Sequence, residues 1–340
     1  MDRKIRVLVT GCDGQIGRVL VPALRERHGE MEVVASDLRE PEVSGPVATL
    51  DVTDADAVRA LIAREKPDHV YHLAGVLSAV GERDPGRAWQ VNLNGFLNVL
   101  EACREHGVSR VFFPSTIAVY GPDAASEATP DDAPTRPTTV YGIAKAAGEN
   151  LAAWYRRRFN LDVRVLRYPG VIGWESLPGG GTTDYAVEIY HAAVANETYR
   201  CPLSAERALP MLAMADAIRG TIDFMAAPAE QIRQSTGYNL GGFSGAPQDF
   251  VAAITRLMPT FNVQYQPDHR DQIAASWPAG LDDSAARQDW GWAPQFDIDS
   301  LSEEMLAQCA AQLAARAAAL AAEVAGRRYD NVERLQRKAG

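Results

Sequence analysis

The chain has 340 residues, of which 46% are hydrophobic and 23% charged, a balance typical of a soluble globular protein with one or two domains. Its net charge of −10 argues against a nucleic-acid partner, and no stretch approaches the roughly 18 apolar residues of a membrane helix. The four cysteines are far apart and show no metal-binding spacing. We therefore expect reduced thiols, no bound metal, no leader peptide and a cytoplasmic location.

The first half of the chain alternates between short apolar strand patterns and helical patterns. Strands are predicted at residues 5–10, 32–36, 69–73, 110–114 and 163–167, and helices at 15–28, 54–65, 87–106 and 138–159. This alternation is typical of βαβ units and predicts an α/β fold with a Rossmann-type, doubly wound parallel sheet covered by helices on both faces. We expect this domain to span residues 1–172 and to bind its ligand at the carboxyl ends of the strands.

The pattern becomes less regular after about residue 172. Helical patterns at 184–196, 216–225, 247–258 and 300–324 are separated by segments rich in glycine and proline. We expect residues 173–340 to form mainly a smaller α/β substrate-binding lobe and a C-terminal helix. Some strands within about 213–245 are expected to return to the main sheet.

A glycine-rich loop follows the first predicted strand and opens the first helix. It contains Gly11, Gly14 and Gly17, with Gln15 and Ile16 at the start of the helix. Glycines at such a turn let the backbone approach a pyrophosphate, whose charge the helix N-terminus attracts. The spacing G-x-x-G-x-x-G is one residue longer than the usual dinucleotide-binding pattern G-x-G-x-x-G. The alternative to a pyrophosphate-binding loop is a tight turn between strand and helix that binds no ligand.

An aspartate ends the second predicted strand. Asp37 lies about 20 residues after the glycine loop, the position expected to bond an adenosine ribose. Its carboxylate would repel a 2′-phosphate, which favours NAD over NADP, although Arg39 nearby keeps NADP as an alternative. Leu38 and the pair Asp51-Val52 are further candidates for contact with the adenosine, and a solvated loop aspartate is the alternative for Asp51.

Tyr141 and Lys145 are four residues apart in a predicted helix, so their side chains share one face. An ammonium close to a phenol favours the phenolate and lowers the phenol pKa from about 10. A phenol with a lowered pKa is a candidate general base toward an alcohol. The same spacing also occurs by chance on many helices, so the glycine loop upstream is what gives it weight.

Several motifs together resemble the extended short-chain dehydrogenase/reductase family, which includes the nucleotide-sugar epimerases. They are the glycine loop, His72-Leu73-Ala74-Gly75, Val91-Asn92-Leu93-Asn94-Gly95, the segment 115–121 and the segment 141–145. The resemblance implies Thr116, Tyr141 and Lys145 as catalytic residues, with Lys145 also bonding the nicotinamide ribose. It further implies cofactor contacts from Leu73, Ala74, Gly75, Asn92 and Tyr168, and a position near the substrate for Ser115.

Within that family, the second half of the chain resembles the short-chain-type L-threonine 3-dehydrogenases. The resemblance lies in residues 168–172, 179–191, 209–211, 276–278 and 282–287. It implies NAD-dependent oxidation of L-threonine to 2-amino-3-ketobutyrate without a metal. The glycine run before Thr182 and Thr183 also reads as a helix start with exposed amides, which attracts a carboxylate. The predicted substrate-binding residues are therefore Ser78, Ser115, Thr116, Tyr141, Gly181, Thr182, Thr183 and Trp277, with an ordinary capped helix and a core tryptophan as the alternatives.

Two other functions remain as alternatives: a nucleotide-sugar epimerase, dehydratase or reductase, and a non-catalytic NAD-sensing regulator. Sugar-nucleotide enzymes of the family usually carry an asparagine where this chain has Gly170, and regulators commonly lack the tyrosine or lysine that this chain keeps. The resemblance also implies a homodimer formed through the helices at 138–159 and 87–106. The β-keto acid product is prone to decarboxylation, which makes a functional link to a 2-amino-3-ketobutyrate CoA ligase plausible.

Overall fold

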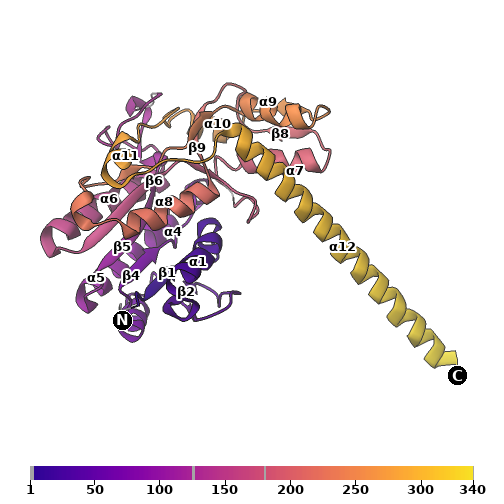
Figure 1. Cartoon of the computed structure of the whole chain (residues 1–340), viewed down its shortest axis with the longest axis horizontal. Coiled ribbons are helices and arrows are strands. Elements are labelled where there is room, and N and C mark those ends of the chain that lie inside the picture. Colours follow the sequence, from indigo (N-terminus) through magenta and orange to yellow (C-terminus); the bar gives the residue numbers. More distant parts are fainter. Residues whose placement is uncertain (1–3, 125–126, 180, 340) are drawn as a thin grey trace.

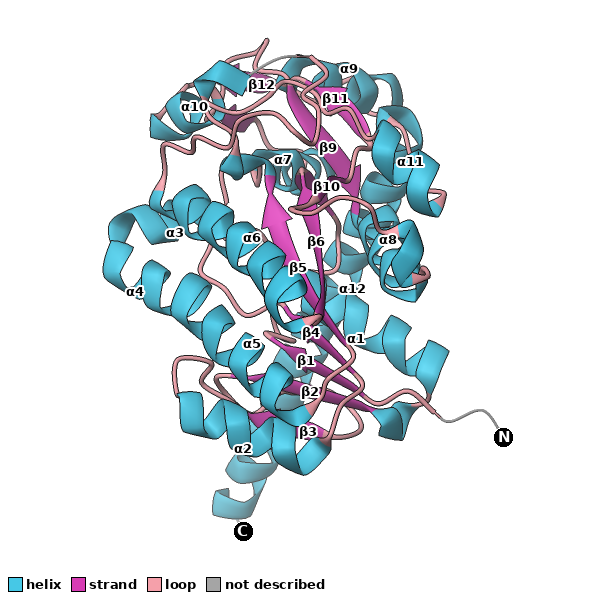
Figure 2. Ribbon diagram, turned by 90° about the vertical axis from the view of Figure 1, so that its left-hand side faces the viewer, coloured by secondary structure: helices cyan, strands magenta, loops and turns pink. Residues whose placement is uncertain are grey.

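The computed structural model describes residues 4–124, 127–179 and 181–339. Its centre is a seven-stranded sheet in the order β10-β6-β5-β4-β1-β2-β3, in which every neighbouring pair is parallel (Figure 2). The strands are β1 (Val7–Thr10), β2 (Val33–Asp37), β3 (Val47–Thr49), β4 (His69–His72), β5 (Arg110–Thr116), β6 (Asp162–Tyr168) and β10 (Tyr238–Asn239). This order, which reverses between β1 and β4, confirms the predicted Rossmann-type sheet.

Helices cover both faces of this sheet, each over its own apolar core. One face carries α1 (Gln15–His28), α8 (Met214–Ala226) and α11 (Ser284–Trp290); the other carries α2 (Ala55–Glu65), α5 (Gly95–His106) and α6 (Val140–Phe159). The central strands are buried along their length because helices exclude water on both sides. Such a strand therefore needs a continuous run of apolar residues in the sequence.

Local signals fix several helix ends where the sequence places them. The Asp54 carboxylate accepts the N–H groups of Asp56 and Ala57 in the first turn of α2. Gly107, with φ of 69°, follows the last residue of α5. The predicted helix over 87–106 is instead three consecutive pieces: α4 (Pro85–Trp89), a π-helical turn η2 (Gln90–Asn94) and α5. The short α3 (Ser78–Arg83) and strand β3 were not predicted.

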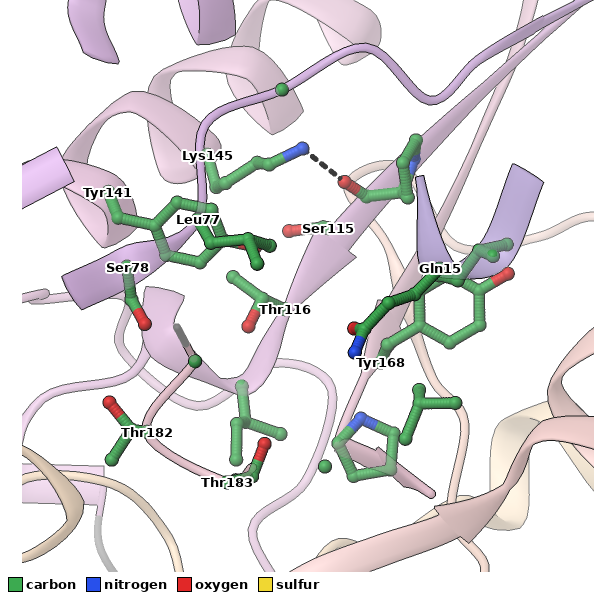
Figure 3. Close-up of a pocket in the computed structure, with 18 of the residues that line it drawn as sticks. Gln15, Leu77, Ser78, Ser115, Thr116, Tyr141, Lys145, Tyr168, Thr182 and Thr183 are labelled. Atoms are coloured by element: carbon green, nitrogen blue, oxygen red, sulfur yellow. Dashed lines mark hydrogen bonds between the residues drawn. The ribbon is translucent and has the colours of Figure 1, made fainter. Parts of the chain in front are cut away.

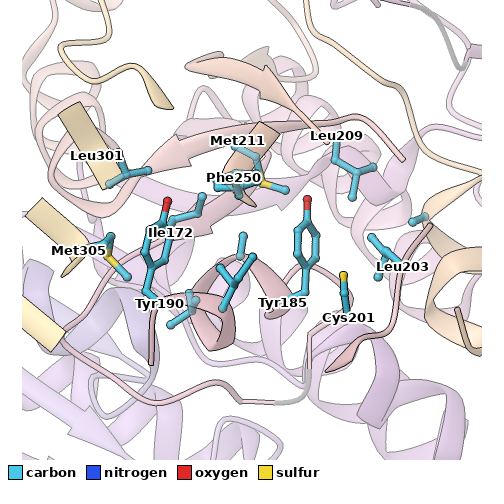
Figure 4. Packing of buried hydrophobic residues seen from close by; sticks show 14 of the residues in the cluster. Ile172, Tyr185, Tyr190, Cys201, Leu203, Leu209, Met211, Phe250, Leu301 and Met305 are labelled. Atoms are coloured by element: carbon cyan, nitrogen blue, oxygen red, sulfur yellow. The ribbon is translucent and has the colours of Figure 1, made fainter. Parts of the chain in front are cut away.

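In the described part of the chain, the smaller lobe contains two small sheets with helices packed beside them. One sheet has the order β11-β9-β7 and the other pairs β12 with β8. The elements are β7 (Gly170–Ile172), α7 (Tyr185–Val194), β8 (Tyr199–Cys201), β9 (Leu209–Ala213), β11 (Phe243–Gly245), α9 (Pro247–Leu257), β12 (Val263–Tyr265) and α10 (His269–Ala274). Tyr185 and Tyr190 of α7 pack with Phe250 and Met211 in a buried core (Figure 4). Short 3-10 turns occupy η1 (Glu30–Glu32), η3 (Ile117–Val119), η4 (Pro122–Ala124) and η5 (Ala229–Gln231).

The C-terminal helix is longer than predicted. Helix α12 (Ile298–Ala339) packs its first turns against α7 and α9 and then projects away from the body (Figure 1). Its alanine-rich sequence without proline favours helix even where packing does not support it. Among the described residues, no helix is long and apolar enough to span a membrane.

Candidate active site

Two adjoining cavities lie at the edge of the main sheet where β1, β4 and β5 reach their carboxyl ends. The first, of about 180 Å³, is lined by Tyr141, and the second, of about 340 Å³, is lined by Asp37. Leu73, Gly75 and Val76 line both cavities, so the two form one continuous cleft. This is the edge at which doubly wound sheets bind their ligands.

The second cavity brings together the residues predicted for the adenosine and phosphates. Its lining includes Gly11, Gly14, Asp37, Leu38, Asp51, Val52, Leu73, Ala74 and Gly75. At Gly11, φ is 74° and an added Cβ would lie 2.4 Å from the Ala74 nitrogen, so only glycine allows this close approach. The Asp37 carboxylate accepts the N–H groups of Asp13 at 2.9 Å and Leu38 at 2.7 Å. Bare backbone and a fixed carboxylate therefore fit a dinucleotide.

Helix α6 and strand β5 bring the predicted catalytic residues together in the first cavity (Figure 3). The Thr139 hydroxyl caps α6 and so sets the position of its first turn. Tyr141 and Thr116, at the end of β5, both line this cavity, and Thr116 lowers the pKa of the tyrosine. Lys145 Nζ donates to the Pro114 carbonyl oxygen at 2.7 Å and lies 5.9 Å from the centre of the Tyr141 ring. Gln15 and Ile16 also line this cavity.

Burial disfavours the charged form of both α6 groups. It raises the pKa of Tyr141 to about 12, against the lowering effect of the Thr116 side chain. It lowers the pKa of Lys145 to about 7, against the raising effect of the Glu149 carboxylate. The prediction that Lys145 lowers the Tyr141 pKa below its usual value is therefore wrong in this structure. Desolvation is the largest cause of the Tyr141 shift, and Lys145 is not among the groups that shift this pKa.

The predicted substrate-binding residues face the first cavity from separate segments. Besides Tyr141 they are Ser78, Ser115, Thr116, Gly181, Thr182, Thr183 and Trp277. Within the described part of the chain, the buried Thr182 hydroxyl and the Trp277 indole N–H have no hydrogen-bond partner, so both are available to a polar ligand. The prediction of an exposed amide is wrong for Gly181, because its N–H donates to the Asp184 carboxylate at 2.8 Å. Helix α7 begins at Tyr185, after this turn.

Three of the predicted binding residues use their polar groups inside the protein. The Ser115 hydroxyl donates to Glu149 at 2.5 Å, and the Tyr168 hydroxyl is bonded to a threonine of α8. The Asn92 amide accepts the Val76 N–H at 2.7 Å and donates to the Val76 carbonyl at 2.9 Å. Ser115 and Tyr168 still line the first cavity, whereas Asn92 stands in the described lining of neither cavity and instead fixes the loop after β4.

Comparison with known proteins matches this geometry. Residues 7–241 match the NAD dependent epimerase/dehydratase family. The chain belongs to this family. This match confirms the family resemblance noted in the sequence.

The similar proteins include several threonine dehydrogenases. The mitochondrial L-threonine 3-dehydrogenase of Bos taurus is 42% identical over 88% of this chain and 82% of its own length. A GalE-like L-threonine dehydrogenase from Cupriavidus necator, solved in its holo form, is 45% identical with a TM-score of 0.87, covering 89% of this chain and 99% of that one. A monomeric L-threonine 3-dehydrogenase from a metagenome, in its apo form, is 42% identical with a TM-score of 0.87, covering 90% and 99%.

One charged residue of this family member's cavity was missed by the sequence reasoning. Asp184 is the carboxylate in the described lining of the first cavity, and it is 7% exposed. Its position after Thr182 and Thr183 was interpreted only as part of a helix start. Capping and ligand binding use the same residue types, so the sequence alone could not separate the two roles.

A cluster of possible metal ligands lies between the glycine loop and the end of β2. Cys12, Asp13 and Asp37 offer ligand atoms within 4.8 Å of one another. Asp37 already accepts two backbone N–H groups, and burial raises the pKa of Cys12 to about 12, which keeps its sulfur a thiol. Metal binding by cysteine requires the thiolate, so this donor set fits the cofactor loop better than a metal.

Proposed function

We infer that the chain is an NAD-dependent L-threonine 3-dehydrogenase, which oxidises L-threonine to 2-amino-3-ketobutyrate and forms NADH. One observation carries this inference: Tyr141, Lys145 and Thr116 lie where a dinucleotide-shaped cleft meets a small pocket containing Thr182 and Asp184. That junction is where a substrate hydroxyl and a cofactor ring would meet. The threonine dehydrogenases among the similar proteins support the same substrate.

NAD, when bound in the cleft, supplies the acceptor for the substrate hydride. Tyr141 takes the proton of the β-hydroxyl, while Thr116 bonds the same oxygen and fixes its position. Burial lowers the pKa of Lys145 to about 7 and raises that of Tyr141 to about 12, and we propose that the two residues together lose one proton near pH 7 and keep a second one on either residue. The form with a phenolate and an ammonium is the productive one. Lys145 is also the residue proposed to hold the cofactor ribose.

The pocket offers groups for both charged ends of an amino acid. We assign the substrate carboxylate to Thr182, Thr183 and the indole of Trp277, because the Thr182 hydroxyl and the indole N–H are otherwise unpartnered among the described residues. The substrate ammonium is assigned to the Asp184 carboxylate, with Ser78 beside it in the pocket lining. Opposite charges at fixed positions would favour an α-amino acid over a simple alcohol.

Preference for NAD over NADP is assigned to Asp37. Its two oxygens are held by the N–H groups of Asp13 and Leu38, so the carboxylate cannot turn away from the ribose site. A 2′-phosphate placed there would face a fixed negative charge.

A sugar-nucleotide substrate is disfavoured by packing around Gly170. An added Cβ at this position would lie 2.5 Å from the Met211 sulfur and 3.0 Å from a Thr183 methyl carbon. An asparagine here, with which sugar-nucleotide enzymes of the family hold their substrate, would require the Met211 and Thr183 side chains to move. The close packing around Gly170, in the lining of the first cavity, is consistent with a small substrate.

The test is NADH formation measured by absorbance, with L-threonine compared against L-serine, D-threonine and L-allo-threonine. Rapid turnover with L-threonine is expected. No NADH formation with any of the four amino acids would favour the alternative function, a sugar-nucleotide enzyme. Tyr141→Phe is expected to reduce kcat at least about a hundredfold, since general-base catalysis typically contributes 10²–10⁴-fold, with NAD affinity retained. A Phe variant with a near-normal rate would contradict the assignment of the base.

A homodimer formed through α5 and α6 is a further part of this proposal. Exposed large side chains lie on this side of the molecule: Trp89 of α4, Leu97 of α5, and Ile143 and Trp154 of α6 are each 37–44% exposed. We expect light scattering to give the mass of two chains and Trp154→Lys to give one. The β-keto acid product is proposed to pass to a 2-amino-3-ketobutyrate CoA ligase.

A further inference from the structure

A buried carboxylate lies directly behind the catalytic pair. Glu149 is one helical turn beyond Lys145 on α6, and the two residues are 2% and 5% exposed. Arg167 of β6 donates to both carboxylate oxygens, from Nε at 2.9 Å and from Nη2 at 2.6 Å. The Ser115 hydroxyl donates to the same carboxylate at 2.5 Å. Glu149 therefore joins three elements of the site, although no catalytic step described above uses it.

The ion pair is fixed from its far end as well. Arg167 Nη1 donates to the Tyr120 hydroxyl at 2.7 Å and to the Asp131 carbonyl oxygen at 2.6 Å. Pairs buried this deeply add little net stability, because desolvation of both charges offsets their attraction. A rigidly held charge next to a catalytic lysine points instead to a role in the chemistry.

Few titratable groups face Lys145. They are Tyr141 and Glu149 from α6 and His72 from β4, while β5 contributes the carbonyl oxygen that accepts the ammonium. Burial lowers the pKa of His72 to about 3, so this ring stays neutral at working pH. Arg167, on β6, neutralises part of the Glu149 charge. The remaining negative charge of Glu149 stabilises the ammonium form of Lys145, whereas burial disfavours that form.

We propose that Glu149 is a positioning residue of the dehydrogenase site: fixed by Arg167, it keeps the shared proton of the catalytic pair on Lys145 rather than on Tyr141. This rests on the proposed function, because the location of that proton matters only if Tyr141 acts as the base. The carboxylate is one turn from Lys145 and two turns from Tyr141, so it stabilises the ammonium more than it opposes the phenolate. Through Ser115 it also holds the end of β5, next to Thr116.

Glu149→Gln tests the charge while keeping the size of the side chain. With the charge removed, the first proton leaves the pair more easily, so the acid limb of the kcat–pH profile should move down by about one pH unit. The second proton then resides more on Tyr141, so the plateau kcat should fall about tenfold. Loss of structure alone would lower the plateau without moving the limb. NAD affinity and Tm, measured on the same samples, report folding independently of activity.

Tyr120→Phe is the matched control, since it removes a hydrogen bond to the same Arg167 and changes no charge near pH 7. Its acid limb should stay at the wild-type pH even where its Tm falls. If Glu149→Gln does not fold, the double variant Glu149→Gln/Arg167→Met removes the pair as a neutral unit and should move the limb in the same direction. A limb that stays at the wild-type pH in the folded variant overturns this inference. A wild-type enzyme inactive on threonine overturns the proposed function instead.

Discussion

The third glycine of the loop gives the sharpest prediction about the cofactor site. Gly17 is buried in the first turn of α1, and a methyl group there would lie 2.5 Å from the Gly11 carbonyl oxygen and 2.6 Å from the Cys12 carbonyl oxygen. Ordinary contact begins at 3.4 Å, so helix and loop would have to separate by 3.4 − 2.5 = 0.9 Å. Both obstructing atoms belong to the backbone, and no side-chain rotation relieves the clash.

That separation would displace the part of the chain that is expected to hold the pyrophosphate. The loop is tied to β2 by the Cys12 N–H, which donates to the Ser36 carbonyl at 3.1 Å, and by the Asp13 N–H, which donates to Asp37. A shift near 1 Å strains these bonds and moves the amides away from the phosphates. We expect Gly17→Ala to raise the Kd for NAD by about 10–100-fold, or roughly 1.4–2.7 kcal/mol. Overpacking should also cost about 1–3 kcal/mol of stability.

Gly107→Ala separates the two effects. Gly107 ends α5 with φ of 69°, and an added Cβ there would meet nothing within 4 Å. The variant should lose about 1–2 kcal/mol of stability through backbone strain alone, with an unchanged Kd for NAD. Calorimetric titration with NAD and urea unfolding on both variants provide the comparison. If Gly17→Ala binds NAD as tightly as the wild type, the assignment of this loop to the pyrophosphate is refuted.

Three further predictions concern separate groups. Asp37→Asn should weaken NAD binding about tenfold, since hydrogen bonds to charged groups contribute roughly 1.5–3 kcal/mol. It should also reduce the preference for NAD over NADP, and titration with each cofactor measures both effects. Thr182→Val should raise the KM for threonine about tenfold while leaving the free energy of unfolding equal or higher, because a buried unpartnered hydroxyl is removed. Burial lowers the pKa of His69 to about 4 in the folded chain, against 6.5 unfolded, so its contribution to stability is complete above pH 6.5 and is lost as the pH falls toward 4. Urea unfolding at pH 7 and pH 5 measures how far the free energy of unfolding falls between the two pH values. This fall should be about 2 kcal/mol smaller for His69→Phe than for the wild type.

The sequence was informative where one residue type can satisfy a local requirement. The helix Gln15–His28 was predicted with its observed ends, because a glycine loop precedes it and Gly29 follows it. The central strands were predicted because burial on both faces demands unbroken apolar runs. Strand β3 was missed, since it is a half-exposed edge strand of three residues whose pattern does not differ from that of a loop.

Site residues were predictable where they belong to one element and not where several elements meet. Tyr141 and Lys145 were found from their spacing on one predicted helix, together with the glycine loop upstream. Glu149 and Arg167 come from α6 and β6, and only the fold shows that they touch. Asp184 was visible as an acid after two threonines, but its position in the pocket depends on the turn before α7.

The pKa of Tyr141 shows why local spacing gave the wrong sign. The spacing rule assumes that Lys145 is charged, and charge depends on burial, which no local pattern reports. In the folded chain Lys145 is buried and Tyr141 is partly buried, and on the proposed mechanism the two residues together have one easily lost proton and one retained proton. The catalytic question then becomes where the retained proton resides. We infer that the charges around the pair decide this. Glu149, which Arg167 holds in place from the next strand of the sheet, is the carboxylate that raises the pKa of Lys145. On this reasoning the working unit of the site is the tyrosine, the lysine and the buried ion pair behind them.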